Sequence, residues 1–296
     1  MKTKEDIALV IVLYNPSSDD LKFIKAISSI YFGIIVDNSQ IRNFTEDEIG
    51  KMVYKPLMEN TGIAHAQNIA LRYLMNHKCP QYVLFMDQDS RYSQSFPCDM
   101  TLEYKRIKEN IPNLFLLGPD IINKETGTEY KSIFHHEKNI FNGFVSKREI
   151  ISSGSIADWK TITKIRFMIN SLFIDFVDFE WCWRARRMGY VCGITKNVIL
   201  KHKVGIHSKS VCKYTFMTWS SIRYYYQYRN YLWLTRTAYT PLQWRLATGI
   251  KFVLRLIYFP LFMSDGVACW KQMIKGISDS FRNYSIYKKE ILRYEV

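Results

Sequence analysis

The most constraining feature of this sequence is an apolar run, Tyr82 to Met86, that ends abruptly in Asp87-Gln88-Asp89. Such a run, rich in Val, Leu and Phe, is typical of a strand that is buried on both faces of a sheet. Ligands of open α/β sheets bind outside the carboxyl ends of such strands. Two carboxylates placed there would repel each other unless a cation lay between them, and Mg²⁺ is commonly held by one or two carboxylates together with phosphate oxygens. The run therefore predicts an α/β fold and a candidate metal site, although an acidic turn that caps the next helix would give the same pattern.

Composition narrows the class of protein. The 296 residues suffice for one large core or two modest ones, and a hydrophobic content of 48% is typical of an ordered globular chain. The six cysteines form no Cys-x-x-Cys pair, which argues against a zinc site and a disulfide framework and suits a reducing cytosol. We find neither a signal-peptide pattern nor an uncharged apolar window of spanning length, so we expect a cytoplasmic protein.

The positive charge is concentrated near the C-terminus. Residues 201–296 carry 16 Lys and Arg against 4 Asp and Glu, so most of the net charge of +14 lies there. This part is also rich in Tyr, Trp and Phe, a combination used by helices that lie in the interface of an anionic membrane. Nucleic acid would attract the same composition, but the chain has no recognisable nucleic-acid-binding motif, so we expect no nucleic-acid partner. An aromatic helical packing layer remains the alternative to a membrane surface.

The order of the expected elements follows βαβ units. We expect strands at 7–14, 33–36, 52–54, 82–86 and 114–117, with short strands at 190–194 and 197–200. We expect helices at 18–30, 60–77, 159–169 and 178–188, and helical structure after about 213, interrupted at Pro241 and Pro260. The prediction is a mixed sheet flanked by helices (residues 1–212) followed by a basic, aromatic helical extension (residues 213–296).

Three of the expected strands end in polar clusters. These clusters are Tyr14-Asn15, Asp37-Asn38-Ser39 and Asp87-Gln88-Asp89. Ordinary turn chemistry would explain any one of them, but together at one sheet edge they favour a site for a nucleotide and a metal. The glycine signatures of dinucleotide-binding folds and of P-loop enzymes are absent, which argues against both classes.

An ordered set of motifs along the chain resembles the motifs of a known family. The motifs are Val12-Leu-Tyr-Asn-Pro16, Val36-Asp-Asn-Ser39, Asn60-Thr-Gly-Ile-Ala-His-Ala-Gln-Asn68, Phe85-Met-Asp-Gln-Asp-Ser90 and Asp178-Phe-Glu-Trp-Cys-Trp-Arg184. With them the chain resembles glycosyltransferase family 2, and in particular the bacterial rhamnosyltransferases that build O-antigen and related surface polysaccharides. Asp-Gln-Asp-Ser and the Ser152–Ser155 segment are similar to that subgroup.

The resemblance implies a GT-A fold and an inverting, metal-assisted transfer from a nucleotide-sugar. Asp89 would coordinate Mg²⁺ or Mn²⁺ on the donor diphosphate, and Asp87 would hold the metal or the ribose. The remaining donor-side candidates are Tyr14, Asn15 and Asp37 at the nucleobase and ribose, Asn60, Gly62 and Asn68 at the entrance to the donor pocket, and His202 at the metal or diphosphate.

The resemblance also indicates the general base. Asp178 matches the aspartate of the family's Glu-Asp motif, but the preceding Glu is replaced by Val177, which leaves Glu180 as an alternative base or as a supporting group. Trp181 would stack on a sugar or pack in the core, and Ser153 and Gly154 resemble an acceptor-side loop.

The function implied is transfer of L-rhamnose from dTDP-L-rhamnose onto a saccharide acceptor, expected to be linked to a polyprenyl diphosphate. Such an enzyme would work as a peripheral protein at the cytoplasmic face of the inner membrane. Two alternatives remain: another donor, such as a UDP-hexose or a galactofuranose nucleotide, and a non-catalytic scaffold that binds a nucleotide-sugar.

Overall fold

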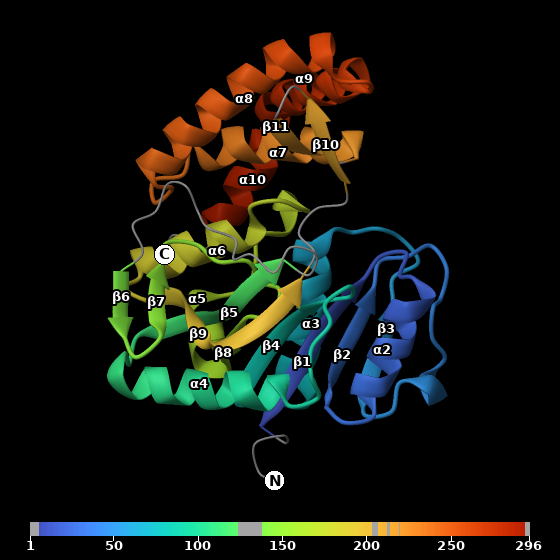
Figure 1. The fold of residues 1–296 in the computed structure, drawn as a ribbon, viewed down its shortest axis with the longest axis vertical. Coiled ribbons are helices and arrows are strands. Elements are labelled where there is room, and N and C mark those ends of the chain that lie inside the picture. The colour runs from blue at the N-terminus through green and yellow to red at the C-terminus, as the bar shows by residue number, and fades with distance from the viewer. Residues whose placement is uncertain (1–5, 124–137, 203–206, 212–213, 219, 294–296) are drawn as a thin grey trace.

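The computed structural model describes residues 6–123, 138–202, 207–211, 214–218 and 220–293 (Figure 1). The main sheet of this described part has the strand order β3-β2-β1-β4-β8-β5-β9-β7-β6. Its strands are β1 (Ile7–Leu13), β2 (Gly33–Asp37), β3 (Met52–Pro56), β4 (Tyr82–Asp87), β5 (Leu114–Asn123), β6 (Lys138–Phe141), β7 (Phe144–Lys147), β8 (Ile156–Asp158) and β9 (Val191–His202). Strands β1 to β4 are parallel to one another, whereas β8 pairs antiparallel with β4 and β5.

Helices cover both faces of this sheet, and a helical layer lies beyond its carboxyl edge (Figure 1). The helices are α2 (Ser18–Ser28), α3 (Ile63–His77), α4 (Phe96–Asn110), α5 (Trp159–Ile165), α6 (Val177–Arg187), α7 (Ser221–Leu234), α8 (Leu242–Phe262), α9 (Gly266–Arg282) and α10 (Tyr284–Ile291). Short 3₁₀ turns occur at Glu46–Glu48 and Asn170–Leu172, and β10 (His207–Val211) pairs with β11 (Tyr214–Thr218) in a separate hairpin.

Strand β1 shows why the sheet is buried on both sides. Its residues Ile7, Leu9, Ile11 and Leu13 join one hydrophobic cluster with side chains of α2 and α4. Its residues Ala8, Val10 and Val12 join a second cluster with side chains of α3 and α6. Because side chains alternate along a strand, a continuous apolar run is needed to fill both cores. The predicted α/β sheet flanked by helices is confirmed.

Several predicted boundaries are wrong. Strand β5 does not stop at Gly118 but continues to Asn123, because β9 pairs with it in parallel along its length. The two short strands expected after residue 190 are one strand, β9, whose partner shifts from Thr195 to Ile199 opposite Pro119 and Asp120. The hairpin β10–β11 was not predicted. Pro260 does not interrupt α8, because it lies in the last turn, where few further backbone bonds are lost.

The C-terminal helices share a core with the sheet domain. Trp233 of α7, Trp244 of α8 and Tyr287 of α10 belong to the same hydrophobic cluster as Trp181 of α6. The predicted boundary at residues 212–213 falls between β10 and β11, and these two residues lie outside the described part of the chain. The division into two units remains a prediction, and the shared cluster shows that the helical layer packs directly on the α/β part.

Candidate active site

The register of the parallel strands brings the three polar clusters to one edge. Leu13 of β1 pairs with Asp37 of β2, and Val12 of β1 pairs with Asp87 of β4. The residues that follow each strand therefore emerge side by side at the carboxyl edge, as predicted. This is the edge at which open α/β sheets bind ligands.

Gln88 joins two of these strand ends. Its side-chain amide accepts a hydrogen bond from the Tyr14 backbone N–H (2.7 Å) and donates one to the Tyr14 carbonyl (3.1 Å). The next residue, Asn15, has a left-handed backbone (φ 47°) and donates its N–H to the Ser39 hydroxyl (2.8 Å). The Tyr14 side chain remains half exposed at this edge. The sequence assigned Gln88 no structural role, and its position between two carboxylates gave no signal of this pairing.

The Asp37 carboxylate is directed into the protein. It is fully buried and accepts hydrogen bonds from the Ser39 backbone N–H (2.9 Å), the Asn43 amide (2.8 Å) and the Tyr54 hydroxyl (2.7 Å). Burial, together with the hydrogen bond to Asp37, raises the pKa of Tyr54 to about 12, so this phenol stays a donor at neutral pH. Asp37 thus fixes the loop that follows β2, and its predicted contact with a donor stays a prediction.

Asp87 and Asp89 lie at the carboxyl edge of the sheet, and their predicted roles toward a metal and a donor stay predictions. Asp87 is partly buried at the end of β4, and Asp89 is exposed in the following turn. Within the described residues, no group of three His, Cys, Asp or Glu side chains is arranged to hold a metal. Two carboxylates nevertheless suit Mg²⁺ or Mn²⁺, because such ions usually complete their shell with phosphate oxygens and water. His202 ends β9, and its side chain lies outside the described part.

The Ser152–Ser155 loop lies directly beside this turn. Gly154 donates its N–H to the Phe85 carbonyl (2.8 Å), and Phe85 donates its own to the Ser155 carbonyl (2.9 Å). The hydroxyls of Ser153 and Ser90 are 3.0 Å apart in the buried space beneath the turn. Ser153 and Gly154 are both buried, so the expectation that they face an acceptor is corrected: they support the turn that carries Asp87 and Asp89.

Asp178 reaches the same place from the first turn of α6. Its carboxylate accepts hydrogen bonds from the backbone N–H groups of Ser152 (3.2 Å) and Phe179 (3.0 Å). Burial raises the pKa of Asp178 to about 7, and the negative charge of Asp87 contributes to this rise. A general base works best when its pKa lies close to the working pH, so this carboxylate is suited to accept a proton near neutrality.

The segment before Asp178 is strained. Phe173, Asp175 and Phe176 all have positive φ angles of 64° to 65°, a conformation that residues with side chains rarely adopt. Non-glycine residues in this region persist only where the surrounding structure enforces them, and they gather at functional sites. The strain therefore requires an external support.

Helix α7 supplies that support. The Asn230 amide donates to the carbonyls of Leu172 (2.8 Å), Ile174 (2.8 Å) and Asp175 (3.1 Å). The Arg223 guanidinium forms a bidentate ion pair with the Asp175 carboxylate, with a shortest distance of 2.8 Å. Both residues were absent from the sequence-based candidates, because the contacts cross about 50 residues and leave no local pattern.

Glu180 and Trp181 face away from the sheet edge. Glu180 is fully buried, where it pairs with Arg184 (2.9 Å) and accepts a hydrogen bond from the Tyr239 hydroxyl. This placement argues against Glu180 as the base and for a supporting role. Of the two alternatives for Trp181, the structure shows core packing, because the side chain is fully buried and its ring packs edge-on against Phe85 and Phe115.

The Asn60–Asn68 segment is only partly exposed at the site. Asn60 is exposed, and its side chain accepts the Gly62 backbone N–H (3.0 Å). Gly62 has a φ of 85°, and a Cβ there would lie 2.6 Å from Phe173, so its close approach is to the strained segment. Asn68 is fully buried and bonds the Met168 carbonyl (2.7 Å), so its expected role at the donor pocket is corrected to support of residues 168–170.

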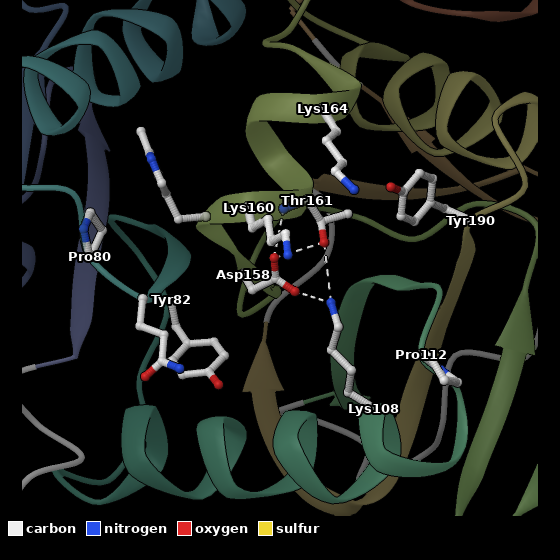
Figure 2. Close-up of a pocket in the computed structure, with 11 residues that line it drawn as sticks. Pro80, Tyr82, Lys108, Pro112, Asp158, Lys160, Thr161, Lys164 and Tyr190 are labelled. Atoms are coloured by element: carbon white, nitrogen blue, oxygen red, sulfur yellow. Dashed lines mark hydrogen bonds and ion pairs between the residues drawn. The ribbon is translucent and has the colours of Figure 1, made fainter.

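A pocket elsewhere in the fold is distinct from this site. A cavity of about 720 Å³ is lined by Tyr82, Asp158 and several lysines, which Figure 2 draws as sticks. Tyr82 begins β4, five residues before Asp87, so this cavity lies at the opposite edge of the sheet. The Asp158 carboxylate in it is already paired with Lys108 and caps α5 through Thr161. None of the candidate site residues at the carboxyl edge lines this cavity.

Comparison with known proteins agrees with this geometry. No protein-family model matches the chain. Over 259 residues the chain is 31% identical to the dTDP-rhamnosyl transferase RfbF of Shigella flexneri, covering 80% of this chain and 82% of that protein.

Solved glycosyltransferases share the fold. A structure of Staphylococcus aureus TarS, residues 1–349, superposes with a TM-score of 0.56 at 12% identity, covering 93% of this chain and 80% of TarS. GalNAc-T7, solved with UDP, GalNAc and Mn²⁺, gives a TM-score of 0.51 at 10% identity over 81% of this chain, which spans about half (52%) of that protein. The predicted GT-A fold is confirmed.

Proposed function

Because the chain belongs to the family of the dTDP-rhamnosyl transferase RfbF and is a glycosyltransferase, we propose that it transfers L-rhamnose from dTDP-L-rhamnose to a saccharide hydroxyl with inversion. The observation that carries this proposal is the position of Asp178. Its carboxylate, with a pKa of about 7, is bonded to Ser152 in the loop that lies beside Asp87.

The donor would lie along the carboxyl edge. Tyr14, Asn15 and the loop fixed by Asp37 are proposed to surround the nucleobase and ribose, with Asn60 near the entrance. Asp87 and Asp89 would hold Mg²⁺ or Mn²⁺ against the diphosphate. When bound, this ion would neutralise the charge that develops on the leaving nucleoside diphosphate.

The proposed transfer is a single displacement. Asp178 removes the proton of the acceptor hydroxyl, and that oxygen forms a bond to the anomeric carbon of rhamnose. The bond from this carbon to the diphosphate breaks on the opposite face, and dTDP leaves. The protonated Asp178 then returns its proton to solvent. The buried turn around Ser90 and Ser153 keeps the carboxylates of β4 and α6 in a fixed relation.

We propose that the acceptor is a saccharide linked to a polyprenyl diphosphate. We also propose that the protein acts at the cytoplasmic face of the inner membrane. The support is the basic composition of residues 201–296, which carry 16 Lys and Arg against 4 Asp and Glu. No helix in the described ranges is long and apolar enough to cross a bilayer.

Measurements of donor binding test which nucleotide-sugar the protein uses. Thermal unfolding is measured with Mn²⁺ and dTDP-L-rhamnose, dTDP-glucose, UDP-glucose or UDP-galactofuranose. We expect dTDP-L-rhamnose to raise the unfolding temperature most, since a ligand that binds the native state stabilises it. An increase with a UDP-sugar and none with dTDP-L-rhamnose would overturn the proposed donor.

A further inference from the structure

Helix α8 presents a continuous apolar face to solvent. Its seven outward aliphatic side chains are each 58–69% exposed, and they are Leu242, Leu246, Ile250, Val253, Leu254, Ile257 and Leu261. At 3.6 residues per turn they fall within an arc of about 120° along the helix. Large contiguous apolar patches on a protein surface mark sites that contact another protein or a membrane.

The opposite side of α8 is already packed. Trp244, Phe252 and Phe259 are buried, and the Phe252 ring stacks on Tyr228 of α7 at a centroid distance of 4.4 Å. In Figure 1, α8 lies on the outer side of the helical layer, away from the sheet. Among the described residues, the exposed face therefore takes no part in the hydrophobic core.

The exposed surface of α8 and α9 carries lysines. Helix α8 contains no Asp or Glu, and its Lys251 is exposed. Arg245 and Arg255 turn to the packed side, where they donate to the Thr240 carbonyl and to Gln227. The adjoining helix α9 exposes Trp270 and Ile274 together with Lys271 and Lys275. Exposed aliphatic side chains together with exposed lysines and a tryptophan are typical of helices that lie in a membrane interface.

We propose that this face of α8, together with the exposed Lys271 and Lys275 of the next helix, α9, binds the surface of an anionic lipid bilayer. This inference rests on the proposed function at a membrane and identifies the surface of the protein that contacts the lipid. Charge selects lipid over a second copy of the chain, because two copies would bring two basic faces together, whereas anionic headgroups complement them. The helix lies parallel to the membrane, with its aliphatic side chains among the acyl chains.

Vesicle flotation tests this contact with the full chain and without nucleotide or acceptor. The vesicles contain 30% phosphatidylglycerol in phosphatidylcholine, and pure phosphatidylcholine serves for comparison. We expect Ile250→Gln/Ile257→Gln to lower the partition coefficient by more than about tenfold, since two buried aliphatic side chains are lost. Glutamine is a good helix former, so the fold of α8 is retained.

The matched control changes two exposed apolar side chains on other helices. Met75 of α3 and Leu102 of α4 are 47% and 58% exposed, and Met75→Gln/Leu102→Gln should bind vesicles as the wild type does. Lys271→Gln/Lys275→Gln should weaken binding to the phosphatidylglycerol vesicles several-fold and leave the weak binding to phosphatidylcholine unchanged.

Three results would overturn the proposal. The first is wild-type protein that stays at the bottom of the gradient, and the second is an Ile250→Gln/Ile257→Gln variant that floats as the wild type does. The third is a wild-type dimer in light scattering that this variant converts to a monomer, which would assign the face to a second copy. Neither readout involves rhamnose, so failure here is separate from failure of the proposed donor.

Discussion

The backbone N–H of Ser152 donates a hydrogen bond to the carboxylate of Asp178, at 3.2 Å. Through this bond the first turn of α6 is tied to the loop that pairs with β4 just before Asp87. The candidate base is 91 and 89 residues from the candidate metal ligands Asp87 and Asp89 along the chain, and all three are thereby held at one edge of the sheet. This arrangement leads to five predictions.

Asp178→Asn should stabilise the protein at high pH. Burial raises the pKa of Asp178 to about 7, so the folded state favours its neutral form. The wild type loses this contribution as pH rises from about 4 to 7, and the loss amounts to at most about 4 kcal/mol. Chemical denaturation without metal should show the variant more stable than the wild type at pH 8 and equal to it at pH 4. Equal stability at both pH values would show that Asp178 is ionised without cost.

Asn230→Ala should destabilise the fold and slow catalysis. The carbonyls of Ile174 and Asp175 lose the Asn230 amide as donor, whereas the Leu172 carbonyl keeps the Ile174 N–H and the Arg229 guanidinium. Each loss of a donor in a buried place costs about 1–3 kcal/mol. We expect kcat to fall more than donor affinity, because the segment leads into Asp178. Asn113→Ala is the control, since Asn113 also donates to a carbonyl but is exposed near Gly189. Wild-type kcat and stability in Asn230→Ala would contradict the role given to α7.

Gln88→Ala should weaken donor binding. The variant loses both hydrogen bonds to the Tyr14 backbone, which are together worth about 1–3 kcal/mol. Calorimetric titration with dTDP should show Kd increased by about tenfold, and the unfolding temperature should fall slightly because the two bonds also stabilise the free protein. Gln81→Ala, at the opposite end of β4, should leave Kd unchanged. A wild-type Kd for dTDP in Gln88→Ala would show that the position of Tyr14 does not affect donor binding.

Asp89→Asn should change the response to metal without changing stability. Asp89 is exposed, so the metal-free variant should unfold at the wild-type temperature. The Mn²⁺ concentration that gives half-maximal activity should rise by more than about tenfold. The exposed Asp47 gives the control Asp47→Asn, for which we expect the wild-type response. The same Mn²⁺ dependence in both variants would remove Asp89 from the metal site.

The sequence predicted the sheet edge well because strand patterns are local. The apolar runs of β1, β2 and β4 require burial on both faces, and parallel pairing then brings Asn15, Asp37 and Asp87 together. The ion pair of Glu180 with Arg184 could also be predicted from the sequence, since a spacing of four residues places the two side chains on one helix face.

Other features depend on contacts across the fold and could not be predicted. The support of Asp175 by Arg223 joins residues 48 positions apart, and only the packing of α7 reveals it. Trp181 gave an ambiguous signal because tryptophan serves both in cores and at sugar sites, and its burial depends on Phe85 and Phe115. The exposed face of α8 was visible only as apolar composition, and its outward direction is set by the burial of Trp244 and Phe259 on the other side.

The fifth prediction concerns the base itself and is tested by the initial rate of dTDP release from dTDP-L-rhamnose. The rate is measured at pH 8 with Mn²⁺ for the wild type and for Asp178→Asn. We predict steady release by the wild type and a decrease of about 10² to 10⁴ in the variant, with dTDP affinity unchanged. Equal turnover in the two proteins would contradict the role of Asp178, and negligible turnover in both would favour a scaffold that only binds nucleotide-sugars.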